Sequence, residues 1–147
     1  MRFVCDAAGG KAWFRIETEA EAAKESELMR HAVEKHFRRA YEQASLAYRP
    51  APGPFVEQDI GRAAHIRSAM PVFLTLRDGE GNALATAMLL PPQRLLAAGR
   101  DDVAICPMVV GPGNGDPYPE HGEAIRDLGR HFGLSLDRIR CYPYGRL

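Results

Sequence analysis

A glycine-rich stretch at residues 111–116 holds the residue types best suited to binding a ligand. It contains Gly113 and Asn114 and ends at Asp116, and His121 follows at the start of an expected helix. A strand, a glycine-rich turn and a helix N-terminus in this order can bind an anion through free backbone amides. These four residues form the candidate ligand-binding site.

Neighbouring residues weigh against an anion at this site. Pro117 and Pro119 each remove a backbone amide, and the carboxylates of Asp116 and Glu120 would repel a negative charge. No Gly-Lys-Ser/Thr follows the glycines, so the segment is not a phosphate-binding loop of the Walker type, and the dinucleotide fingerprint is also missing. An ordinary structural turn explains the same residues.

A catalytic alternative combines this loop with Cys106. A nucleophilic triad of Cys106, His121 and Asp116 can be written down, but nothing in the sequence brings the three side chains together. Ile105 and Met108 flank the thiol, which predicts burial and low reactivity. The alternative function is therefore a small-molecule enzyme with a site around residues 111–121 and Cys106, and the sequence does not decide whether the protein is an enzyme.

Metal and cofactor chemistry finds little support. His31 shares an expected helix face with Glu27 and Glu34, which could hold a divalent cation from one side. A second helix with a matching ligand pattern is missing, so we expect a solvated face with local ion pairs, no metal and no cofactor.

The cysteine count indicates a reducing compartment. The sequence has three cysteines, Cys5, Cys106 and Cys141. Their odd number and the lack of a Cys-x-x-Cys pair argue against a disulfide framework and a zinc site. We expect three reduced thiols and a cytoplasmic location.

The length and the net charge limit the number of domains and the classes of partner. The 147 residues suit one domain spanning residues 1–147, and 19 basic residues balance 19 acidic ones, so nucleic acid is not an expected partner. Sixteen of the basic residues are arginines, which indicates a bacterial coding bias. The sequence has no apolar run long enough to span a membrane.

The element pattern predicts an α+β fold with a largely antiparallel sheet. Two hairpins and two C-terminal strands should form the sheet, with one long N-terminal helix and one shorter C-terminal helix beside it. The expected hairpins cover residues 2–16 and 72–90, the strands 103–110 and 137–142, and the helices 19–48, 58–68 and 119–132.

The helix expected over residues 19–48 leads to a prediction about assembly. At 1.5 Å per residue it would be about 45 Å long, whereas a compact domain of this size is only about 38 Å across. Either the helix breaks, near Ser26 or His36, or one of its ends projects, or a second chain covers the excess. Our leading hypothesis is a non-catalytic ligand- or partner-binding domain that forms a homodimer, with the long helix or the aromatic tail at residues 141–147 in the interface.

Overall fold

The sheet has five antiparallel strands in sequence order. The computed structural model describes residues 1–50, 52–92 and 107–145, and all statements on structure refer to these. The strands are β1 (Arg2–Ala7), β2 (Lys11–Arg15), β3 (Val72–Arg77), β4 (Ala83–Leu89) and β5 (Met108–Val110). The predicted α+β class with an antiparallel sheet is confirmed, as are both hairpins.

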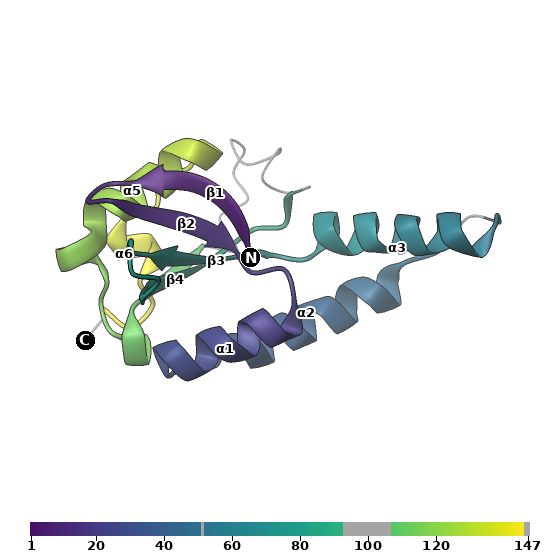
Figure 1. Ribbon diagram of the computed structural model, residues 1–147, viewed down its shortest axis with the longest axis horizontal. Helices are drawn as coiled ribbons and strands as arrows, with labels where there is room; N and C mark the ends of the chain where they lie inside the picture. Colours follow the sequence, from purple (N-terminus) through teal and green to yellow (C-terminus); the bar gives the residue numbers. More distant parts are fainter. Residues whose placement is uncertain (51, 93–106, 146–147) are drawn as a thin grey trace.

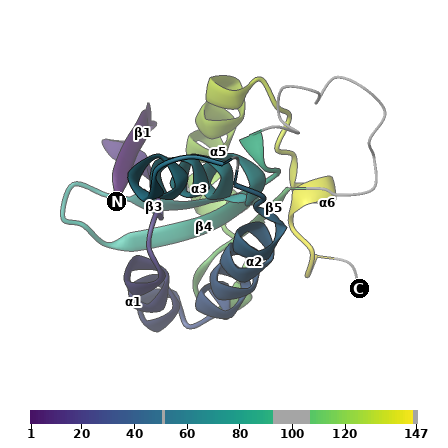
Figure 2. The ribbon, with the colours of Figure 1, turned by 90° about the vertical axis from the view of Figure 1, so that its right-hand side faces the viewer.

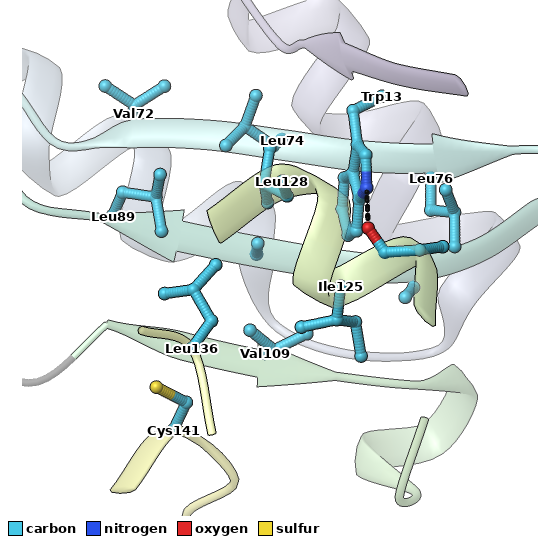
Figure 3. Packing of buried hydrophobic residues seen from close by; sticks show 13 residues of the cluster. Trp13, Val72, Leu74, Leu76, Leu89, Val109, Ile125, Leu128, Leu136 and Cys141 are labelled. Atoms are coloured by element: carbon cyan, nitrogen blue, oxygen red, sulfur yellow. Dashed lines mark hydrogen bonds between the residues drawn. The ribbon is translucent and has the colours of Figure 1, made fainter. Parts of the chain in front are cut away.

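Helices cover both faces of this sheet. Helices α1 (Glu19–Met29) and α2 (Val33–Ala47) lie against one face, and α5 (Tyr118–Phe132) lies against the other (Figure 1, Figure 2). The face under α5 carries the larger apolar core, which includes Trp13, Leu74 and Leu128 (Figure 3). The indole Nε1 of Trp13 donates a hydrogen bond of 2.8 Å to the carbonyl oxygen of Ala124, so the ring is buried without an unpaired donor.

The prediction of one long helix over residues 19–48 is wrong. This segment forms two antiparallel helices, because Arg30 takes a left-handed conformation (φ 54°, ψ 50°) and ends α1. The Oγ of Ser26 then accepts a hydrogen bond from the amide of Glu34 at 2.8 Å, across the turn. Met29, at the end of α1, and Val33, at the start of α2, are both buried on either side of this turn.

Helices α2 and α3 (Phe55–Ala69) form an antiparallel pair, here called the helical arm, that extends away from the sheet (Figure 1). Helix α3 is longer than the helix predicted at residues 58–68. At the base of the arm, Phe37, Ile66 and Met70 pack with Phe73 of the sheet and form the second apolar cluster.

The C-terminal region departs from its prediction. Residues 137–142 are not a strand, because the side chain of Asp137 accepts a hydrogen bond from the amide of Arg140 and starts helix α6 (Arg138–Cys141). Ile139 is exposed and Cys141 is buried, so they do not share a face as predicted. Of the strand predicted at residues 103–110, only β5 falls within the described residues.

The last long helix ends where the sequence predicts. Gly133 follows α5 with a left-handed φ of 69°, which is the usual C-cap of a helix. Among the described residues, no helix is long and apolar enough to cross a membrane.

Candidate functional site

The four predicted ligand-binding residues do not converge on one site. Gly113 and Asn114 lie in the 3-10 turn η1 (Pro112–Asn114), where both have a φ of 62°. Asp116 accepts hydrogen bonds from the Tyr118 amide and, at 2.6 Å, from Nε of Arg138. These bonds tie Asp116 to α5 and α6.

His121 lies in the first turn of α5, against the turn between β1 and β2. Its Nδ1 accepts a hydrogen bond of 2.9 Å from Nζ of Lys11, and no hydrogen bond or ion pair joins it to Asp116. Burial and the nearby charge of Lys11 lower the pKa of His121. It lines an open depression of about 430 Å³. The predicted triad therefore lacks its His121–Asp116 pair, and Cys106 lies outside the described residues.

A polar chain that sequence reasoning missed crosses the interface between α1 and the sheet. Its centre is Glu25, whose side chain has no exposed surface. One carboxylate oxygen accepts from Arg77 of β3 at 2.7 Å, and the other accepts from the hydroxyl of Thr86 on β4 at 2.7 Å. Nε2 of His31 lies 2.9 Å from the same hydroxyl oxygen.

These contacts fix the tautomer of His31. The ionised carboxylate of Glu25, paired with Arg77, can only accept, so the one hydroxyl proton of Thr86 must point to it. The hydroxyl oxygen therefore accepts from His31, and Nε2 carries the imidazole proton. In the neutral ring, Nδ1 is then an acceptor.

That acceptor has no hydrogen-bond partner. Among the described residues, only two buried side-chain polar atoms lack one, Nδ1 of His31 and Nε2 of His65. Burial lowers the pKa of His31, although a hydrogen bond with its own backbone and the charge of Glu25 oppose this, so the neutral ring is favoured near pH 7.

His31 lines a small cavity, here called the His31 cavity. It has a volume of about 110 Å³ and lies between the α1–α2 connection, β4 and β5. Most of its wall is apolar, and the lining includes Val33, Phe73, Met88, Met108 and Tyr144. Asn114 also lines it, so this one predicted site residue lies at the cavity that the polar chain reaches.

The expected solvated face with local ion pairs is confirmed for Glu27, which pairs with Lys24, and for Glu34, which pairs with Arg38. It is wrong for His31, which lies in the connection after α1 with its ring half-buried against Thr86. Within the described ranges, no group of three His, Cys, Asp or Glu residues could hold a metal ion. Within the described residues, Cys5 and Cys141 form no disulfide.

One sequence signal could have revealed the chain. Glu25 lies three residues after Ala22 and four before Met29, and all three are buried on one face of α1. A carboxylate in an apolar helix stripe must find a buried partner.

Comparison of the chain with known protein families, curated proteins and solved structures gives no match.

Proposed function

We propose that this protein is a small-molecule-binding domain and that its ligand occupies the His31 cavity. The observation that carries the proposal is a largely apolar cavity of about 110 Å³ whose lining includes three residues with polar side chains, His31, Thr86 and Asn114. Ligand pockets are typically concave, mostly apolar and provided with a few polar groups that orient the ligand.

A purely structural role explains less of the polar chain. Arg77 and Thr86 already satisfy the carboxylate of Glu25 and fasten α1 to the sheet. His31 adds a hydrogen bond to this anchor through the hydroxyl of Thr86. The anchor does not account for the apolar cavity beside it, whereas ligand sites combine an apolar wall with a few fixed polar groups.

Methionine methyl groups provide a direct test. Met108 lines the His31 cavity, whereas Met70 lies at the base of the helical arm and lines other grooves. With methyl-labelled methionine, titration with ring-sized fragments should shift the NMR signal of Met108 saturably and leave that of Met70 unchanged. If no fragment shifts Met108, the cavity is not a binding site and the proposal fails.

A second proposal concerns assembly as a homodimer through the helical arm. The arm extends from the sheet (Figure 1). It carries Leu46 and Ile60, whose side chains are 77% and 66% exposed. Exposed apolar surface on a soluble protein marks candidate interaction sites, and two-fold dimers are the commonest closed homo-oligomers.

The catalytic alternative has less support. Asp116 and His121 each have partners of their own, Arg138 and Lys11, so neither is poised to activate a thiol. The odd number of cysteines and the lack of a Cys-x-x-Cys pair support the proposed cytoplasmic location.

A further inference from the structure

We infer that a second site, at the base of the helical arm, binds a small monocarboxylate that carries an apolar group. The site is a cavity of about 170 Å³, here called the arm-base pocket, between the end of β2, helix α2 and the C-terminal half of α3. Its lining combines two arginines, Arg15 and Arg67, with apolar side chains. The inference goes beyond the proposed function, because it does not involve the His31 cavity.

The apolar wall of the arm-base pocket comes from the packing of the arm on the sheet. Phe37 and Ile66 are buried members of the second apolar cluster and also line the pocket, as does Met70. Tyr41 adds an aromatic side chain that is 47% exposed. An apolar cavity of about 150 Å³ holds a benzene molecule, so this pocket has room for an apolar group of about five carbon atoms and a polar group at its open side.

The two arginines bring positive charge that no carboxylate neutralises. Within the described part of the chain, neither Arg15 nor Arg67 forms an ion pair. Nη2 of Arg15 donates to the carbonyl oxygen of Arg67 at 3.1 Å, which leaves four other N–H donors on this guanidinium. Of the described lining residues, Glu17 alone has a carboxylate, and Nε of Arg2 lies 3.5 Å from its Oε1.

The pKa of Arg15 responds to this surplus of positive charge. Burial lowers the pKa of its guanidinium, and the charges of Arg67 and Arg2 lower it further, whereas the charge of Glu17 opposes them. A half-buried cation beside like charges gains from a bound anion. A carboxylate fits this role, because its two oxygens match the planar fork of a guanidinium.

The rest of the lining selects the class of anion. Phosphate would bring a second negative charge beside the carboxylate of Glu17 and no apolar surface to cover Phe37 and Ile66. Acetate has one charge but would leave most of the apolar wall in contact with water. A monocarboxylate with a branched apolar group satisfies both the arginines and the wall.

Isocaproate and its neutral amide, isocaproamide, test the inference because they have the same number of heavy atoms. In NMR titrations read at the methyl group of Met70, isocaproate should give a saturable shift. Isocaproamide should bind about tenfold more weakly, since hydrogen bonds to an ionised group are stronger than those to a neutral one. Acetate and inorganic phosphate should also bind more weakly than isocaproate.

Four variants assign the binding to the two arginines. Arg67→Met and Arg15→Met keep an apolar stem and remove the charge, so each should lower isocaproate affinity about tenfold and change isocaproamide affinity by less than about twofold. Arg67 is exposed, so its replacement does not disturb the core. Glu17→Gln should raise isocaproate affinity, because it removes an opposing charge. Arg39→Met is the matched control, since Arg39 is exposed on α2 and lines a different groove; it should change neither affinity.

The outcomes separate this inference from the proposed function. Equal affinities for isocaproate and isocaproamide, tighter binding of phosphate, or unchanged isocaproate binding in both Arg67→Met and Arg15→Met would overturn it. An equal loss in Arg39→Met would also overturn it, by showing a general attraction to the charged surface. No shift at Met70, or a shift at Met108 alone, would refute the arm-base pocket and leave the His31 cavity as the proposed site.

Discussion

The buried carboxylate of Glu25 accepts hydrogen bonds from Arg77 and Thr86, which replace those that water would donate at the surface. Arg77→Met removes the cationic partner and leaves a buried carboxylate, so the free energy of unfolding should fall by about 3 kcal/mol. The double variant Glu25→Met with Arg77→Met removes both charges and should lose clearly less. Urea unfolding of the two variants measures the difference. Equal losses would show that the charge pair is not the important contact.

The titration of His31 should make stability depend on pH. Its folded pKa is lowered by burial below the ordinary value of 6.5, so the unfolded chain binds a proton more readily than the folded protein. The free energy of unfolding should therefore fall as the pH drops below about 6.5 and level off below the folded pKa. This dependence should be weaker in His31→Gln, as measured by urea unfolding at pH 7.5 and pH 5.5. An identical pH dependence in both proteins would contradict the burial of the ring.

In helix α5, replacing either of two glycines with alanine should change the free energy of unfolding, and the two changes should have opposite signs. Gly133 has a φ of 69°, whereas Gly122 lies within the helix, and an added Cβ would meet nothing within 4 Å at either position. Gly133→Ala should lower the free energy of unfolding by about 1 kcal/mol through backbone strain. Gly122→Ala should raise it by about 0.5–1 kcal/mol through helix propensity. Thermal unfolding measures both, and the same sign for both would refute this account of the C-cap.

The elements that sequence reasoning predicted correctly are those with local causes. Glycine pairs and turn residues set both hairpins, and Gly133 ends α5. The break at Arg30 has no such local signal, because a helix-favouring residue is held there in a left-handed conformation by burial on both sides of the turn. The strand predicted at residues 137–142 failed because the cap at Asp137 outweighed a short alternating pattern.

The candidate site could not be predicted from the sequence for a similar reason. Thr86 lies 61 residues after Glu25 and 55 after His31, and only the fold brings their polar atoms within hydrogen-bond distance. Of the four predicted site residues, only Asn114 lines the His31 cavity. Periodicity and motif spacing report local geometry, whereas this site is made by packing one helix end on two strands.

The whole molecule should be a homodimer if the helical arm is an interface. Size-exclusion chromatography with light scattering should give twice the chain mass of 16.2 kDa at micromolar concentration. Leu46→Glu together with Ile60→Glu should shift the protein to monomer, because both side chains are exposed on the arm and neither supports the monomer core. A substitution of Tyr48 would test the interface less cleanly, because the Tyr48 hydroxyl donates a hydrogen bond to the carbonyl oxygen of Gln58 within the arm.

A control variant distinguishes the arm from apolar exposure in general. Ile139 is 74% exposed but lies on α6, away from the arm, so Ile139→Glu should remain a dimer. A mass of 16.2 kDa for the unmodified chain would refute the dimer. A dimer that persists in the arm variant would place the interface elsewhere.

The central claim is that His31 is a neutral ring at the cavity whose Nε2 donates to Thr86, and the ¹⁵N resonances of its imidazole test this most directly. Long-range proton–nitrogen spectra at pH 7 should show a protonated Nε2 and an unprotonated Nδ1. A ring protonated at Nδ1 in the free protein, whether as the other tautomer or as the cation, would contradict the account.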